Sequence, residues 1–262
     1  MSMAQTYLDD LRRRREEILE RVDIALGHAG RSREDVKIMA VSKTVDIDAA
    51  ADAVRAGYTL LGENRPQELV RKFEGLHAID DLPQVRLDMI GNLQKNKINA
   101  VLGHAEVIHS IESLDLARAV SQRASRRLEA GEFLAPQQVL LEVNVSGEES
   151  KSGFAPEALR ACIEDLMELS GISIRGLMTM APQGSKEVAA KTFAGLRELR
   201  DELEGAYPSL TLSELSCGMS EDFDVAIEEG STPVSYTHLD VYKRQALSFP
   251  TLATSSLSCP IS

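Results

Sequence analysis

Cysteine and long apolar runs are scarce in this sequence. The 262 residues include three cysteines, an odd number without metal-like spacing. We interpret Cys162, Cys217 and Cys259 as buried or incidental thiols of a reducing compartment. No run of about 18 apolar residues is present to span a membrane, and residues 1–17 lack the apolar centre of a secretion signal. These absences predict a cytoplasmic protein with no membrane partner.

Positive charge is also in deficit. Lys and Arg number 29 against 41 Asp and Glu, which gives a formal net charge of −12. Because nucleic-acid binding depends on basic side chains that neutralise phosphates, we expect no nucleic-acid partner. We interpret the basic run Arg12–Arg15 as the solvated face of an amphipathic helix over residues 4–28. A local basic pocket for one phosphate remains compatible with this charge.

Two common kinds of site have no signature here. The five histidines are scattered and never stand at ligand spacing from cysteines or carboxylates, so no metal site is expected. No glycine-rich nucleotide motif follows the first apolar strand. Any chemistry therefore has to be sought in the loops of the fold.

Short apolar segments alternate with helical ones along most of the chain. Strands are predicted at residues 36–42, 58–61, 85–90, 105–109, 138–145, 172–178 and 210–215. Helices are predicted at 46–56, 64–77, 94–102, 114–130, 156–169, 185–205 and 221–229. This alternation indicates an α/β fold with a parallel sheet. An open doubly wound sheet fits too, but seven nearly equal units favour a closed TIM-type (β/α)8 barrel.

A closed barrel needs an eighth strand, and none can be read in the sequence. It should begin near Ser231, but residues 233–262 are rich in Ser and Thr, nearly free of acidic residues and interrupted by three prolines. We therefore expect strands one and seven to keep open edges, with the barrel core facing water on one side.

Lys43 is the first candidate for chemistry, because reactive groups of α/β barrels lie where the strands end. It directly follows the apolar run 39–42. Removing an ammonium from water at this place would favour the neutral, nucleophilic amine that forms a Schiff base. The alternative is a lysine that extends along the barrel rim with its ammonium in water.

The loop at residues 216–222 is the second candidate. Gly218 frees the backbone, and Ser220 adds a hydroxyl group at the start of a helix. Exposed backbone N–H groups and the helix dipole make such a turn an anion site, and barrels often hold phosphate after strands seven and eight. Together with Lys43 across the mouth, this loop suggests a phosphorylated carbonyl compound as the ligand. After strand two, Glu63 and Asn64 add polar groups to the same rim.

Seven segments of the chain resemble the pyridoxal phosphate homeostasis protein family. Taken together, in order and at the spacing of the family, they are highly specific, and the resemblance extends from about residue 5 to residue 232. The segments are AVSKT (40–44), GEN (62–64), IGNLQKNK (90–97), IHSIES (108–113), NVSGEESKSGF (144–154), RGLMTMAP (175–182) and GMSEDFDVAIEEGST (218–232).

The resemblance implies a single barrel domain over residues 1–232, like the N-terminal domain of alanine racemase. It implies that Lys43 carries pyridoxal 5'-phosphate as a Schiff base, that Asn64 lies beside the cofactor, and that Gly218, Met219 and Ser220 help to hold its phosphate. Family members sequester the cofactor without robust turnover and influence vitamin B6 balance. The resemblance therefore implies no catalytic residue, a monomer in the cytoplasm, and apo-enzymes that depend on the cofactor as partners.

The chain departs from the family at a few positions. Asp88 and Met89 stand where the family has His and an aromatic residue, and Cys217 stands where Met is common. Ser235 occupies the position of an Arg near the pyridine nitrogen. We interpret residues 233–262 as a non-family tail, an assembly artefact or a frameshifted read, which would weaken folding and cofactor binding. Sequencing across codon 232 tests this interpretation.

Two other functions remain open at this point. A racemase-like enzyme dependent on pyridoxal phosphate would need a second base facing Lys43. A barrel aldolase would use Lys43 as a Schiff base with sugar phosphates. A visible absorbance that is lost in Lys43→Ala separates both cofactor-binding functions from the aldolase.

Overall fold

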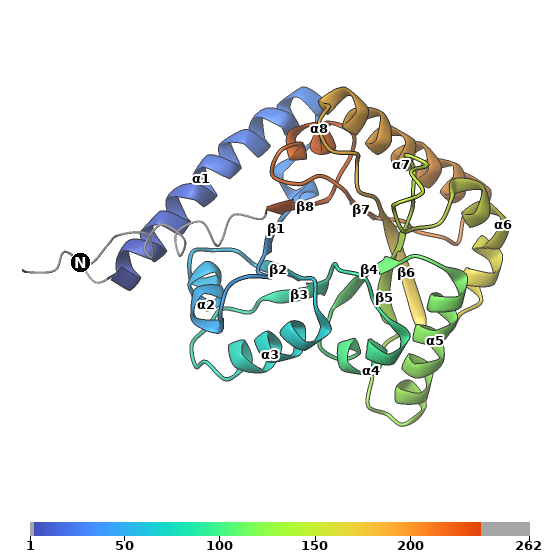
Figure 1. The fold of residues 1–262 in the computed structure, drawn as a ribbon, viewed down its shortest axis with the longest axis horizontal. Coiled ribbons are helices and arrows are strands. Elements are labelled where there is room, and N and C mark those ends of the chain that lie inside the picture. Colours follow the sequence, from blue (N-terminus) through green and yellow to red (C-terminus); the bar gives the residue numbers. More distant parts are fainter. Residues whose placement is uncertain (1–2, 237–262) are drawn as a thin grey trace, which may run out of the picture.

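The computed structural model describes residues 3–236 and contains eight strands and eight α-helices in that range. A long helix α1 comes first, and strands then alternate with helices (Figure 1). The strands are β1 (Lys37–Val41), β2 (Leu60–Glu63), β3 (Arg86–Met89), β4 (Val107–Ile111), β5 (Gln137–Glu142), β6 (Ile172–Met178), β7 (Glu214–Ser216) and β8 (Pro233–Tyr236). The helices are α1 (Met3–Ala29), α2 (Ile47–Arg55), α3 (Pro66–His77), α4 (Ile98–Val101), α5 (Leu114–Glu129), α6 (Pro156–Met167), α7 (Lys186–Ala206) and α8 (Phe223–Glu228), with 3-10 turns η1 (Arg33–Asp35) and η2 (Lys95–Lys97).

The strands form one parallel sheet that nearly closes into a barrel. Their order is β7-β6-β5-β4-β3-β2-β1-β8, so each strand lies beside its neighbour in sequence and β8 returns to β1. At the seam between β7 and β8, Thr232 N donates to Leu215 O at 2.9 Å and Ser235 N donates to Gly218 O at 3.1 Å. Helices surround the strands (Figure 1). The predicted TIM-type barrel is confirmed.

The expectation of a missing eighth strand is wrong. Pro233–Tyr236 pairs in parallel with β1, and Pro233 stands at the first strand position, where a missing N–H is tolerated. Val234 is 2 % exposed because it packs with Val22 of α1 and Phe223 of α8. Parallel pairing needs backbone groups and one apolar side chain here, which even this atypical segment supplies. The edge of β1 is therefore covered, and residues 237–262 lie outside the described residues.

Local sequence signals explain most of the element boundaries. Asp46 caps α2 by accepting a hydrogen bond from Ala49 N at 3.0 Å. Other boundaries differ: the helix predicted at 94–102 is split into η2 and α4, and the strand predicted at 210–215 is β7 at 214–216. Asn64 does not cap α3, since Arg65 holds that position.

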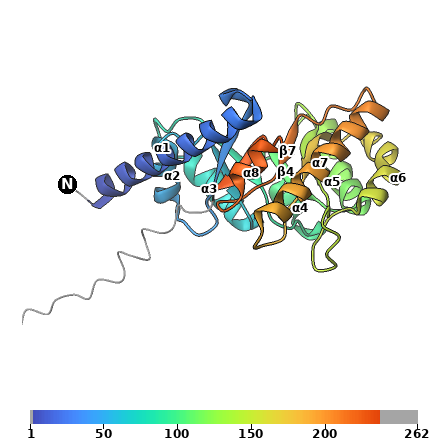
Figure 2. The same cartoon turned by 90° about the horizontal axis from the view of Figure 1, so that it is seen from above.

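The amphipathic helix predicted at 4–28 is confirmed as α1, which lies beside α2 and α8 (Figures 1 and 2). Its apolar positions, among them Ile18 and Val22, are buried. Arg12 and Arg13 are exposed and form ion pairs with aspartates one turn earlier, as expected of a solvated face. None of the helices in residues 3–236 is both long and apolar enough to cross a membrane.

Candidate functional site

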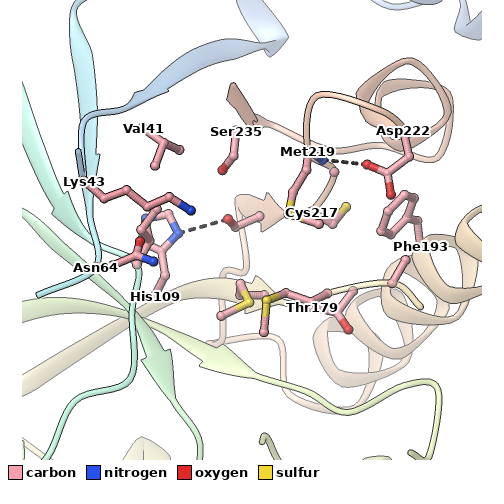
Figure 3. Close-up of a pocket in the computed structure, with 16 residues that line it drawn as sticks. Val41, Lys43, Asn64, His109, Thr179, Phe193, Cys217, Met219, Asp222 and Ser235 are labelled. Atoms are coloured by element: carbon pink, nitrogen blue, oxygen red, sulfur yellow. Dashed lines mark hydrogen bonds between the residues drawn. The ribbon is translucent and has the colours of Figure 1, made fainter. Parts of the chain in front are cut away.

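A pocket opens at the ends of the strands, on the side of the barrel where β1 and β2 lead into their loops (Figure 3). Its empty space amounts to about 710 Å³, including its opening to solvent. Apolar side chains form much of the wall. The lining residues are Val41, Lys43, Asn64, Ile90, His109, Met178, Thr179, Met180, Ala181, Phe193, Ser216, Cys217, Gly218, Met219, Asp222 and Ser235.

Lys43 lies in the turn directly after β1, and its side chain extends into this pocket (Figure 3). The two residues before it, Val41 and Ser42, are buried, which fixes where the lysine leaves the strand. Lys43 itself is exposed. The expectation that it is desolvated is therefore wrong, because its four-carbon stem carries the ammonium past the rim into the open part of the pocket.

Asn64 also lines the pocket, at the end of β2. The loop after β3 packs tightly against it: a Cβ on Gly91 would lie 2.2 Å from Asn64 O. Only glycine allows this approach, which sets the Asn64 backbone beside Ile90, another lining residue. The glycine in the sequence IGNLQKNK thus positions the pocket wall and does not line it.

Gly218 and Met219 line the pocket, whereas Ser220 lines an adjoining cavity between the loops before α7 and α8. The helix begins later than predicted, with Asp222 at its cap position. Asp222 Oδ1 accepts the Met219 N–H at 2.6 Å (Figure 3). Burial raises the pKa of Asp222. The Asp222 carboxylate therefore accepts the Met219 N–H, one of the backbone donors expected from the sequence to bind phosphate.

Gly218→Ala is expected to destabilise the protein by about 1–3 kcal/mol. Gly218 has φ +88°, and an added Cβ would lie 2.4 Å from Ala226 Cβ in α8. Urea denaturation measures the change. Gly205→Ala in α7 is the control, since it meets nothing within 4 Å. Equal stability of the Gly218→Ala variant and the unmodified protein would contradict the expectation.

Glu63 does not lie at the rim as predicted but is fully buried behind it. It accepts hydrogen bonds from Lys72 Nζ and, at 2.7 Å, from Ser42 Oγ. Lys72 also donates to Ser42 O. Both charged side chains are at most 1 % exposed. This buried ion pair ties α3 to the end of β1, directly before Lys43.

A chain of buried and half-buried polar groups runs through the barrel interior to the pocket. His109 lines the pocket, with Nδ1 2.9 Å from Ser216 Oγ and Nε2 2.9 Å from Asp88 Oδ2. Arg86 donates to both Asp88, at 2.8 Å, and Glu214, at 3.2 Å. Burial by itself would raise the pKa of Asp88, but its bonds to His109 and Arg86 outweigh burial and lower it. The chain holds the His109 ring in one orientation.

Sequence reasoning missed this network, although a signal was present. Arg86 and Asp88 stand two residues apart in an otherwise apolar strand, and His109 likewise interrupts one. Alternate residues of a barrel strand face the interior, so polar residues at such positions mark an interior network. Asp88, which stands where the family has a histidine, therefore faces the inside of the barrel.

Glu142, at the end of β5, is another buried acid. Its burial raises its pKa to about 7, and the negative charge of nearby Glu112 adds to this effect. A folded-state pKa above the unfolded value of 4.5 means that the folded protein binds the proton more tightly, so stability falls as pH rises from about 4.5 to 7.

We expect Glu142→Gln to be more stable than the unmodified protein by about 2–3 kcal/mol at pH 8 but not at pH 4.5. Urea denaturation at both pH values, with exposed Glu198→Gln as control, checks this; a pH-independent difference would contradict it.

The remaining polar groups offer neither a metal site nor a thiol nucleophile. Residues 3–236 contain no group of three His, Cys, Asp or Glu side chains able to hold a metal ion. Burial raises the pKa of Cys217 to about 12, so its thiol stays protonated. What the pocket offers is one exposed amine, an amide, apolar walls and the glycine-containing turn at Gly218. These groups suit a flat, partly apolar carbonyl compound.

Comparisons with known proteins agree in fold and family. The family model of the alanine racemase N-terminal domain matches residues 16–229. The pyridoxal phosphate homeostasis protein of Aquifex aeolicus is 40 % identical over 218 residues, 83 % of this chain and 91 % of the relative.

Solved structures give the same picture. PipY of Synechococcus elongatus with PLP bound is 32 % identical, with a TM-score of 0.70 over 84 % of this chain and 98 % of that one. An alanine racemase of Clostridium difficile shares the fold, with a TM-score of 0.62 at 18 % sequence identity. The match covers 84 % of this chain and 56 % of the racemase chain.

Proposed function

The chain belongs to the pyridoxal phosphate homeostasis protein family, and on that premise we propose that it binds pyridoxal 5'-phosphate and sequesters it for vitamin B6 homeostasis. The observation that carries the proposal is the Lys43 amine, which extends into a largely apolar pocket at the strand ends. A structure of the relative PipY holds PLP.

The residues present fit this cofactor. Pyridoxal phosphate supplies an aldehyde that bonds covalently to an amine. Lys43 provides that amine, and Asn64 lies beside it in the pocket wall. The apolar walls suit the faces of a pyridine ring. Gly218 and Met219 place backbone at the opposite side, with Ser220 beyond them, so that this turn is our choice for the phosphate.

We propose sequestration without robust catalysis because the other proton-transfer groups of the pocket are already engaged. Both ring nitrogens of His109 lie within hydrogen-bond distance of other side chains. The Cys217 thiol stays protonated, and Asp222 accepts the Met219 N–H. None of these groups faces Lys43 as an available second base, which a racemase would require.

Reconstitution with pyridoxal phosphate tests the function. After gel filtration the protein should retain visible absorbance, and borohydride reduction followed by peptide mass spectrometry should locate the adduct on Lys43. No retained cofactor, or an adduct on another lysine, would overturn the proposal. Steady racemisation of amino acids would favour the racemase-like enzyme, and cleavage of a sugar phosphate without added cofactor would favour the aldolase. Gel filtration of the same preparation also gives the oligomeric state, and we propose a monomer. We propose further that this monomer acts in the cytoplasm and delivers the cofactor to apo-enzymes.

We further propose that the functional domain ends with β8 at Tyr236, four residues beyond the predicted bound of 232, and that the following residues are a non-family tail. The family model ends at residue 229, and β8 ends at Tyr236. A chain truncated after Tyr236 is therefore expected to unfold within about 0.5 kcal/mol of the full chain and to retain as much cofactor. Thermal denaturation and the absorbance assay measure both; a large loss of either would show that residues 237–262 are needed.

A further inference from the structure

A second cavity lies at the opposite end of the barrel, where β1 and β7 begin, and its empty space is about 1210 Å³ including its opening. Four arginines line it: Arg31 after α1, Arg175 in β6, and Arg197 and Arg200 in α7. This concentration of guanidinium groups is unexpected in a chain with a net charge of −12.

Two of these arginines are neutralised by neighbours outside the cavity lining. Arg197 NH1 lies 2.7 Å from Glu229 Oε2, and Arg200 NH2 lies 2.7 Å from Asp201 Oδ1. Their side chains remain 36 % and 23 % exposed. Each therefore keeps donors that can turn towards a ligand, since a guanidinium carries five N–H groups.

The other two have no carboxylate within 4.0 Å among residues 3–236. Arg31 donates to the carbonyl oxygens of Ile227 and Ser231 at 2.7 and 2.9 Å. Arg175 donates to Ser213 Oγ at 3.3 Å, and its Nε is buried without a hydrogen-bond partner. A buried guanidinium N–H without an acceptor is costly. Arg175 as a whole is only half-buried and lines the cavity, so its terminal N–H groups are the donors offered to an anion there.

Carboxylates also line the cavity, but two of the four are engaged elsewhere. Glu214 is held by Arg86 from inside the barrel, and Glu228 lies 2.9 Å from a histidine ring nitrogen. The others are Glu34 and Asp35. Burial and the like charge of Arg200 lower the pKa of Arg31 against the opposing effect of Asp35. Lys37 also lines the cavity, so five basic side chains stand against four acidic ones in the lining.

We propose that this cavity binds the phosphate group of a small molecule, at a site separate from the Lys43 pocket. Arginines from three parts of the chain surround a phosphate better than a planar carboxylate, because its oxygens accept hydrogen bonds from several directions. Arg175 and Arg200 make the principal contacts, and Arg31 contributes charge.

Inorganic phosphate is the probe, titrated against chloride at constant ionic strength while the melting temperature is measured. The unmodified protein and Lys43→Ala should show the same saturable rise. Because the turn at Gly218 is also a phosphate candidate, the variants of Arg175 and Arg200 locate the site. Arg175→Gln and Arg200→Gln should each weaken the apparent affinity about tenfold. Arg118→Gln, which removes an exposed pair with Asp165, should not.

A second measurement does not depend on the variants folding. Phosphate should slow phenylglyoxal modification of Arg175 and Arg200, but not of Arg118, in the unmodified chain, as read by peptide mass spectrometry. The proposal is overturned if no saturable rise occurs, if Arg200→Gln titrates like the unmodified protein, or if Lys43→Ala abolishes the response. Equal protection of all three arginines would indicate adventitious binding and would also overturn it.

Discussion

Lys43→Ala is expected to remove the visible absorbance of protein reconstituted with pyridoxal phosphate and to weaken cofactor retention at least ~100-fold, about 2.8 kcal/mol. The substitution deletes the amine that extends into the pocket and leaves the residues before it buried and the barrel intact. Equilibrium dialysis measures the affinity, and the spectrum reports the covalent bond.

Two controls separate the covalent bond from charge. Lys43→Arg keeps the positive charge but cannot form the same bond, so it should also lack the absorbance. Lys95→Ala removes an exposed lysine that pairs with Asp115 and should bind normally. If Lys43→Ala kept its absorbance, the adduct would lie on another amine and the proposed function of this pocket would fail.

Lys72→Met should cost about 3–5 kcal/mol of stability, the largest effect that we expect of one substitution on folding. Lys72 is fully buried and is bound to Glu63 and to the backbone of Ser42. Without it, Glu63 would keep a buried charge with one fewer donor, and Glu63 Oε2 already has no partner. The linear dependence of unfolding free energy on urea concentration measures the loss.

The same experiment separates the ion pair from packing. In Glu63→Gln/Lys72→Met no charge remains buried at this site, so the double variant should be more stable than Lys72→Met alone. Arg71→Met, which breaks only an exposed pair with Glu68 on the same helix, should change stability by less than about 1 kcal/mol. A double variant that is less stable than Lys72→Met would indicate that shape, and not charge, dominates this site.

The barrel was predictable because its strands and helices alternate at nearly constant spacing, and because the apolar runs are short. The pocket residues Lys43, Asn64 and Gly218 were predictable because chemistry in barrels gathers where strands end. The eighth strand was not, because its pairing depends on backbone groups and on the burial of Val234 against residues about 200 positions away in sequence, such as Val22.

The direction of side chains was also beyond sequence reasoning. Lys43 follows β1 and Lys72 lies in α3, and both side chains lie near the end of β1, yet one is exposed and the other is fully buried. What distinguishes them is the ion pair of Lys72 with Glu63, the last residue of β2, and this pair depends on how α3 packs against that strand. The Asp88–His109 contact joins residues from two strands whose register the sequence does not state.

The seam of the barrel joins the beginning of the described chain to its end. Lys43 follows β1 and Ser235 belongs to β8, yet both line the same pocket, and Arg31 bonds to Ser231 in the cavity at the other end. A ribosome releases these segments far apart in time. During synthesis, α1 through β7 therefore remain an unclosed intermediate. Neither cavity can take its final shape until β8 has left the exit tunnel of the ribosome and paired with β1.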